Sequence, residues 1–174
     1  ACYPIVSTWA SPKELGLSEV QELKGHPLAA GNEGSETANV SGEVFDVLGI
    51  NEENSEIWYY GIKGGADGIR DQWADGIHAF TESPVSAYKD LASENRIRFL
   101  SYTDEELDAI LAGHPEYSKI TCVVVSPDGN DSGKGTIASP FKTLEKARDT
   151  ARASSAGSVT VVLRGGKYYR TEAF

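Results

Sequence analysis

The chain has 174 residues, of which 40% are hydrophobic and 24% are charged, and its formal net charge is −10. This length suits one domain, or one domain and part of another, and the composition is ordinary for a folded globular protein. An acidic chain lacks the basic face that nucleic-acid binding requires. No apolar run approaches the roughly 20 residues of a membrane-spanning helix. We therefore expect no nucleic-acid partner and no membrane span.

The charge is unevenly distributed along the chain. Residues 1–121 hold 8 Lys and Arg against 21 Asp and Glu, whereas residues 122–174 hold 8 against 5. This change of sign indicates a boundary, so we expect one domain over residues 1–121 and a shorter segment over residues 122–174. The sequence contains no Met. Ala1 is therefore not an initiator, and we expect a chain that is processed or cut from a longer one.

The first predicted elements are short. We expect a strand over residues 3–9 and then a turn or short helix, because Ser11 opens a capping-box spacing with proline at the first helical position. Ser18 and Gln21 repeat this spacing and predict a second short helix that ends at Leu23.

The stretch 28–37 joins an apolar run to a polar turn bracketed by Gly31 and Gly34. The apolar spacing that follows predicts a helix over residues 36–48, which Gly49 ends. The stretch is thus interpreted as a strand, a tight loop and the beginning of a helix.

Such a helix N-terminus offers unpaired backbone N–H groups and the positive end of a dipole, so it can hold an anion. Ser35 and Thr37 stand where a helix cap is expected. The loop is therefore either an anion site or only a capped helix end, and both interpretations remain open.

Strands and helices alternate from residue 28 to residue 111. This order predicts a parallel sheet covered by helices, in which ligands lie at the carboxyl ends of the strands. The loop 31–37 lies at such an end, as do residues 81–83 and 101–103. The predicted strands are 57–62, 77–81 and 96–101, and the predicted helices are 66–74, 83–93 (capped by Ser83, with Pro84 next) and 103–113 (opened by a Thr103–Glu106 capping box). Gly64 and Gly65 are expected to separate the first of these strands from its helix.

Residues 17–37 combine a short helix, a Leu-Lys-Gly-His-Pro turn, a strand and a Gly-x-x-Gly-Ser-x-Thr loop, and residues 75–80 read Asp-Gly-Ile-His-Ala-Phe. In this order, and with the helix at 83–92 and the segment 96–117, they resemble the TAXI-type solute receptors of TRAP transporters. The likeness covers about residues 15–121. It implies a three-layer α/β lobe of periplasmic-binding-protein type with a parallel sheet, which binds a small carboxylate together with a second lobe.

The resemblance also implies a site. Gly34, Ser35 and Thr37 would form the ligand-facing loop with Gly31 and Asn32, and Thr81 would lie near the edge of the cleft. Two residues depart from the pattern, because Glu33 and Glu36 place negative charges in a loop that should hold a carboxylate.

The C-terminal segment has a pattern of its own. We expect strands over residues 122–126 and 159–163, a loop over 127–133 and a helix over 143–153. The run Val-Ser-Pro-Asp-Gly-Asn-Asp-Ser and the later Leu-Arg-Gly-Gly-Lys-Tyr resemble the N-terminal cap and first coil of right-handed parallel β-helix proteins. That resemblance implies extracellular carbohydrate-active or surface proteins whose catalytic carboxylates lie in later coils, so no catalytic residue is assigned here.

Other chemistry is sparse in the sequence. His26, His78 and His114 are scattered without ligand spacing, and we expect no metal and no cofactor. Cys2 and Cys122 either pair or remain two free thiols. The run at residues 58–60, Trp-Tyr-Tyr, either packs in the core as part of a strand, which the pattern favours, or stacks against a sugar.

These patterns favour an extracytoplasmic (periplasmic or secreted) binding protein, or a subunit derived from one, over an enzyme. Its ligand would be a small polar molecule or carboxylate at the loop Gly31–Thr37. Two alternatives remain: a fragment of a carbohydrate-active β-helix protein, and a structural or interaction subunit that binds no ligand. In each case we expect other protein chains to complete the lobe or the β-helix.

Overall fold

The computed structural model describes residues 5–82, 85–136, 139–154 and 159–168. The chain divides into two compact units, Ala1–Tyr117 and Ser118–Phe174. In the described part of the chain, no helix combines the length and the apolar character that a membrane crossing requires.

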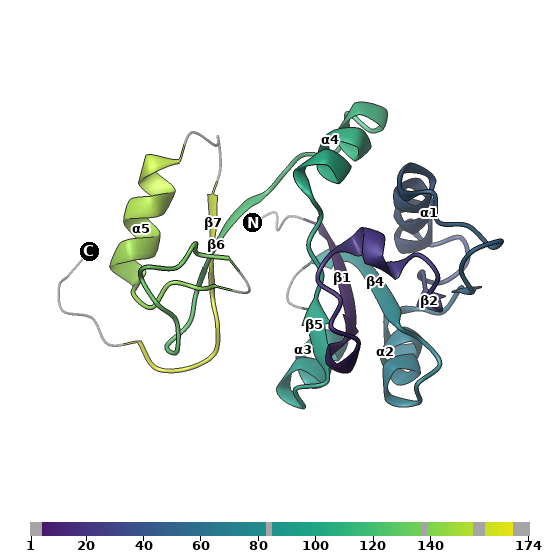
Figure 1. The fold of residues 1–174 in the computed structure, drawn as a ribbon, viewed down its shortest axis with the longest axis horizontal. Coiled ribbons are helices and arrows are strands. Elements are labelled where there is room, and N and C mark those ends of the chain that lie inside the picture. The colour runs from purple at the N-terminus through teal and green to yellow at the C-terminus, as the bar shows by residue number, and fades with distance from the viewer. Residues whose placement is uncertain (1–4, 83–84, 137–138, 155–158, 169–174) are drawn as a thin grey trace. The chain divides into compact units, whose positions relative to one another are not determined.

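The first unit is built on a five-stranded sheet with the order β3-β2-β4-β1-β5 (Figure 1). Its strands are β1 (Ile5–Pro12), β2 (Leu28–Ala29), β3 (Ile57–Trp58), β4 (Gly76–Glu82) and β5 (Ile97–Phe99). The sheet is mixed, whereas the sequence predicted a parallel one. Strand β2 is parallel to β3 and β4, but β1 lies antiparallel between β4 and β5. Strand β1 pairs with β4 from Ile5–Glu82 to Ala10–Ile77 and with β5 from Ala10–Phe99 to Pro12–Ile97, so it separates these two strands.

Helices cover both faces of this sheet. They are α1 (Glu36–Leu48), α2 (Ile62–Arg70), α3 (Ser86–Ser93) and α4 (Asp104–Gly113), and two 3₁₀ turns cover Lys13–Leu15 and Val20–Leu23. Successive strand residues point to opposite faces, so Trp9 belongs to the apolar cluster under α1 and α4, and Ala10 to the cluster under α2 and α3. Figure 1 shows the two helix pairs on either side of the sheet. The three-layer arrangement that the sequence predicted is therefore present.

Helices α1 and α4 have the bounds that local sequence signals predicted. Ser35 caps α1 through a hydrogen bond from the Ala38 amide, and Gly49 ends it in the left-handed conformation with φ of 64°. Thr103 and Glu106 form the predicted capping box of α4. The predicted cap of α3, Ser83 with Pro84, lies outside the described residues.

Helix α2 differs from the prediction. It begins at Ile62, immediately after Gly61, so Gly64 and Gly65 lie inside the helix and the preceding strand ends at Trp58. A Cβ on Gly65 would lie 3.2 Å from both Ala29 Cβ and Ile77 Cγ2. Gly65 therefore allows the helix to pack closely on the sheet, and neither glycine breaks the chain between two elements.

The Trp-Tyr-Tyr run also differs from the favoured prediction. Trp58, Tyr59 and Tyr60 expose 38%, 49% and 49% of their surface instead of packing in the core. The cause is the early end of β3, which places Tyr59 and Tyr60 in the connection to α2.

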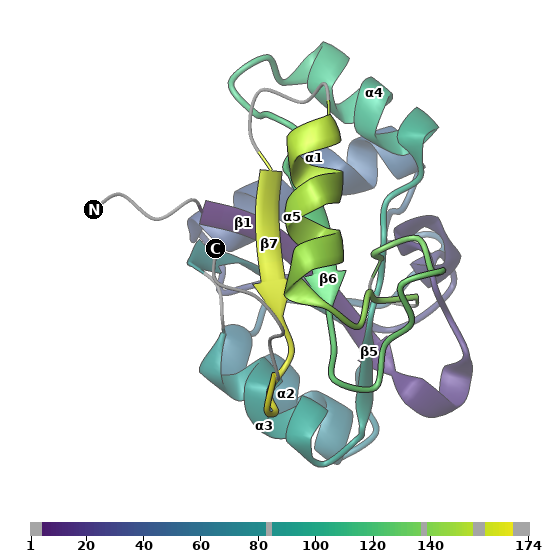
Figure 2. The ribbon, with the colours of Figure 1, turned by 90° about the vertical axis from the view of Figure 1, so that its left-hand side faces the viewer.

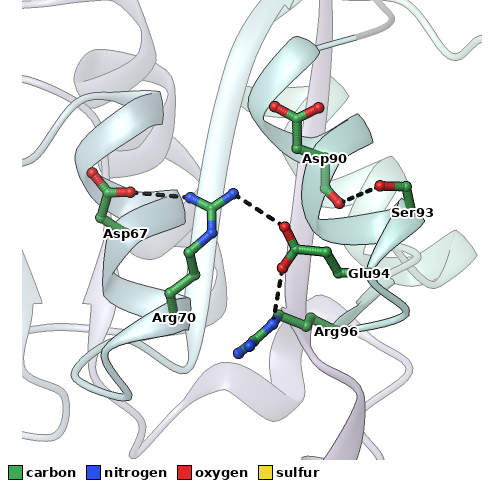
Figure 3. A network of polar contacts seen from close by, with 6 residues as sticks. All are labelled: Asp67, Arg70, Asp90, Ser93, Glu94 and Arg96. Atoms are coloured by element: carbon green, nitrogen blue, oxygen red, sulfur yellow. Dashed lines mark hydrogen bonds and ion pairs between the residues drawn. The ribbon is translucent and has the colours of Figure 1, made fainter.

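Charged side chains join α2 to α3 at the surface (Figure 3). Arg70 lies 3.0 Å from Asp67 on its own helix and 3.8 Å from Glu94, which follows α3. Glu94 is also 2.9 Å from Arg96. The four side chains therefore form a chain of ion pairs across the outer face of these two helices.

The second unit is smaller. Strands β6 (Thr121–Val125) and β7 (Val159–Leu163) pair in parallel, from Thr121–Val159 to Val125–Leu163, and α5 (Leu144–Ala153) lies alongside β7 (Figure 2). A cluster formed by Val123, Val125, Phe141 and Ala147 makes its buried core. The Asp131 carboxylate accepts hydrogen bonds from the amides of Lys142 and Thr143 and so orders the approach to α5.

Cys122 is exposed on β6. Cys2 lies outside the described residues. Cys122 is a free thiol in the structure, as one of the two open alternatives had it.

Candidate functional site

The loop Gly31–Thr37 connects the carboxyl end of β2 to the beginning of α1. Gly31 and Gly34 both have positive φ, 99° and 73°. A Cβ on Gly31 would lie 2.8 Å from Thr37 Cβ and 2.9 Å from the Ala38 amide nitrogen. The loop can therefore turn this tightly over the first turn of α1 only because residue 31 has no side chain.

Ser35 is a helix cap, so the cap interpretation of the loop is confirmed. Its hydroxyl accepts the Ala38 amide at 3.2 Å, and the Asn39 amide donates to its carbonyl. The amides of Glu36 and Thr37 have no hydrogen-bond acceptor within the described residues. The cap thus uses one of the free amides of the helix end and leaves two others for a ligand or for water.

Thr37 ties the loop to the central sheet. It is buried, and its hydroxyl accepts the Phe80 amide of β4 at 3.3 Å. Because β2 and β4 are parallel, their carboxyl ends lie at the same edge of the sheet. The hydroxyl therefore holds the beginning of α1 at this edge.

Thr81 follows Phe80 on β4 and pairs with Val6 of β1. Phe80 packs on the side of α1, so alternation points the Thr81 side chain to the opposite face of the sheet. The structure therefore brings Thr37 to the end of β4, but it does not gather Thr81 with the loop side chains.

The remaining loop residues lie at the surface. Asn32, Glu33, Gly34 and Glu36 are exposed, and the Asn32 carbonyl accepts the Ser35 amide to close the turn. The Asn32 side chain lies against Gly61, where a Cβ would be only 2.7 Å from Asn32 Nδ2. Glu36 occupies the first turn of α1, where a carboxylate stabilises the helix dipole.

A buried histidine supports the loop from beneath, and the sequence reasoning missed it. Ser41 Oγ lies 2.6 Å from His78 Nδ1 and 2.8 Å from the carbonyl oxygens of Ala30 and Thr37, which flank the loop. His78 Nε2 lies 2.9 Å from Ser7 Oγ, and its ring stacks on Trp9 at 4.2 Å. Its place between apolar residues in the run Ile-His-Ala-Phe was the available signal for a buried role.

Burial lowers the pKa of His78 to about 3. The ring is therefore neutral at physiological pH, and one of its nitrogens is an acceptor. The neutral ring links the hydroxyl groups of Ser41 and Ser7 through hydrogen bonds.

Tyr102 continues this polar network through Ser7 and Trp9, and Tyr117 makes a separate polar contact with α1. The Tyr102 hydroxyl accepts Trp9 Nε1 at 2.7 Å, and burial raises its pKa to about 12. The Tyr117 hydroxyl donates to Glu43 of α1 at 2.7 Å, and the Tyr117 ring meets Phe80 edge to face. Burial and the hydrogen bond to Glu43 raise the pKa of Tyr117 above its usual range, so it stays a donor.

Residues 2–143 match the model of the NMT1-like family, and the chain therefore belongs to that family. No curated protein sequence matched the chain.

Solved structures with a similar fold include two SsuA proteins. The periplasmic aliphatic sulphonate binding protein SsuA from Escherichia coli is 17% identical, with a TM-score of 0.46 over 58% of this chain and 33% of that one. The alkanesulfonate-binding protein SsuA from Xanthomonas axonopodis pv. citri bound to MOPS is 21% identical, with a TM-score of 0.45 and the same coverage. The alignment with Tv2483 bound to L-arginine has 12% identity and a TM-score of 0.43, over 66% of this chain and 53% of that one. The chain thus spans about a third of the length of the SsuA proteins.

Proposed function

We propose that the first unit is a lobe of an extracytoplasmic solute-binding protein, periplasmic or secreted, and that it holds a small polar ligand at the loop Gly31–Thr37. The observation that carries this proposal is the pair of unpaired amides, Glu36 and Thr37, at the beginning of α1. They lie at the carboxyl ends of the parallel strands β2 and β4, where α/β sheets bind ligands. The resemblance of residues 15–121 to TAXI-type receptors and the family membership support the same class of function.

The charges of the loop select among ligands. The amides of Glu36 and Thr37 favour a carboxylate, but the exposed side chains of Glu33 and Glu36 repel a second negative charge. A zwitterion such as an amino acid satisfies both conditions, because its ammonium group can face the glutamates. The Asn32 amide at the surface supplies a further donor, whereas Thr81 points to the other face of the sheet and is not part of the proposed site.

The test is a calorimetric titration of the chain with amino acids and dicarboxylates. The panel also includes the ligands named for the fold neighbours: alkanesulfonates, MOPS and L-arginine. Glu36→Pro removes one donor amide while keeping a residue that helices accept at their first position. Glu36→Ala keeps the amide and removes the charge. We expect the proline variant to bind an amino acid about tenfold more weakly, because one charge-assisted hydrogen bond is lost. We expect the alanine variant to bind a dicarboxylate more tightly. A ligand bound equally well by the parent chain and Glu36→Pro would place its site elsewhere.

A subunit that binds no ligand is the second candidate for the same unit. It is favoured by the use of Ser35 as a cap and by the two glutamates at the loop. Such a subunit would give no heat of binding with any compound of the panel. It would instead associate with the chains that complete the lobe, which co-purification from the native source followed by intact-mass analysis detects.

For the second unit we propose the beginning of a parallel β-helix, as the resemblance of residues 122–174 implies. The parallel pairing of β6 with β7 and the apolar side chains exposed on β7 support this proposal, since stacked coils bury such surfaces. A fragment of a carbohydrate-active protein is the matching alternative function. Binding of soluble polysaccharides to the full chain, lost on substitution within the second unit alone, is its test.

A further inference from the structure

An open groove of about 530 Å³ lies along the outer edge of the sheet in the first unit. None of its lining residues belongs to the loop 31–37, so it is a second place where a ligand can bind. It is lined by Pro27, Glu56, Trp58, Tyr60, Gln72 and Trp73.

Three of these residues are aromatic, and Trp73 is the least exposed of them. The end of helix α2 holds Trp73 in place. The Trp73 amide donates to the Gly68 carbonyl at 3.0 Å, and Gln72 has φ of 62°, which together form the helix-ending Schellman turn with glutamine at the left-handed position. A Cβ on Gly68 would lie 2.8 Å from the Trp73 indole. The missing side chain thus lets the indole lie directly on the helix. Trp73 follows α2, which ends at Arg70, and it packs against the apolar cluster that includes Ile69.

The three aromatic rings face the groove at different angles. Tyr60 and Trp73 meet edge to face with centroids 5.1 Å apart, and Trp58 and Trp73 do so at 6.3 Å. Trp58 and Tyr60 are inclined by 32° at 6.3 Å. These rings form a concave corner instead of one flat platform, so a rounded apolar group can contact several of them at once.

The charge of the groove has one sign. Glu56 is its only charged lining residue, its carboxylate is exposed, and no ion pair is recorded for it in the described part of the chain. The surrounding segment, residues 1–121, carries 21 acidic against 8 basic residues, which raises the local concentration of cations. The negative faces of aromatic rings attract cations as well.

We propose that this groove binds an organic cation with an alkylated ammonium group. The methyl groups contact Trp58, Tyr60 and Trp73, the positive charge lies near their faces and near Glu56, and the Gln72 amide orients a polar tail. A sugar would stack on a single ring and need several hydrogen-bond partners. Apart from the tyrosine hydroxyl and the indole N–H groups, the lining offers polar side-chain groups only at Glu56 and Gln72, so the groove fits a sugar less well. The site is independent of the loop ligand of the proposed function.

The experiment titrates the full chain with choline and follows both tryptophan fluorescence and the heat of binding. The comparison ligand is 3,3-dimethyl-1-butanol, which has the shape of choline but no charge. We expect saturable binding of choline and at least about tenfold weaker binding of the alcohol, since cation–π and ion-pair attractions act only on the charged molecule.

Three variants locate the site. Trp58→Leu removes one ring and is expected to weaken choline binding about tenfold. Glu56→Gln is expected to weaken choline binding about threefold to fivefold, and the remaining affinity should depend less on salt. Tyr59→Leu is the matched control, because Tyr59 is as exposed as Tyr60 but does not line the groove. It should bind choline like the parent chain, and so should Glu36→Pro. Unchanged melting temperatures show that each variant is folded.

Several results would overturn the proposal. Equal affinities for choline and the alcohol would show that the groove recognises only the apolar shape of the ligand and not its charge. Saturable binding of a neutral oligosaccharide without binding of choline would make it a carbohydrate platform. An equal loss of choline binding in Tyr59→Leu and Trp58→Leu would show that the attraction is not specific to the groove.

Discussion

Gly31 is the residue on which the shape of the candidate loop depends most. Its φ of 99° is unfavourable for any residue with a side chain, and a Cβ there would meet Thr37 and the backbone of Ala38. Gly42 offers a contrast within helix α1, because a Cβ at that position has open space.

We predict that Gly31→Ala destabilises the protein by about 2 kcal/mol or more through strain and overlap. Gly42→Ala is expected to stabilise it by about 0.5–1 kcal/mol, because alanine is the better helix former. Urea unfolding of the two variants and the parent chain measures both changes. Equal effects of the two substitutions would mean that the turn at residue 31 is not held as described.

His78 contributes to stability through its neutral ring. Its pKa of about 3 in the folded state lies below the ordinary value of 6.5, so the unfolded chain binds a proton that the folded chain does not. This contribution is complete above pH 6.5, and it is lost progressively as the pH falls toward 3.

We therefore predict that stability declines by up to about 1.4 kcal/mol per pH unit through His78 as the pH falls below 6.5. In His78→Asn this part of the slope should disappear, although the variant is less stable at neutral pH. His114→Asn is the control, because His114 lies nearer the surface beside Glu43 and Glu116. The measurement is the free energy of unfolding between pH 4 and 8. An unchanged slope in His78→Asn would contradict a buried neutral ring.

At the scale of elements, α2 and α3 are joined by exposed ion pairs as well as by apolar packing. Arg70 lies between Asp67 and Glu94, and about a third of its side-chain surface is exposed. Ion pairs at such exposure contribute little, because water and salt screen them.

We predict that Arg70→Gln lowers the free energy of unfolding by less than about 1 kcal/mol at low salt, and by less still in 1 M salt. Ile69→Ala, which removes a buried side chain from the same helix, should cost about 2–5 kcal/mol at either salt concentration. Urea titrations at two ionic strengths compare the variants. A large, salt-independent loss in Arg70→Gln would show that the ion pairs hold the two helices together.

At the scale of the whole molecule, the two units differ in the size of their cores. The first unit has two apolar clusters, one on each face of its sheet, whereas the buried core of the second unit consists of Val123, Val125, Phe141 and Ala147. A core this small is expected to give marginal stability.

We predict that a fragment of residues 1–117 unfolds cooperatively near the main transition of the full chain. A fragment of residues 118–174 should melt at lower temperature with a broad transition, because few apolar side chains are buried in it. Circular dichroism of the two fragments and the full chain measures this. If neither fragment folded, the proposed division into two domains would have to be abandoned.

The sequence by itself determined those features that depend on neighbouring residues. The cap at Ser35, the stop at Gly49 and the capping box of Thr103 and Glu106 are local hydrogen-bonding patterns, so they predicted the bounds of α1 and α4. The alternation of strands and helices likewise predicted the layers.

Only the tertiary structure decided the direction of β1, the burial of His78 and the exposure of Trp58. The first two depend on partners distant in the chain, namely β4 beside β1 and the residues Ser7 and Ser41 around the histidine, whereas Trp58 lies on β3 at the edge of the sheet. Local propensity contains no term for such contacts. The sequence therefore predicted where the candidate loop lies. The hydrogen-bond network of His78 and the aromatic groove depend on the tertiary structure, because the sheet places their residues next to one another.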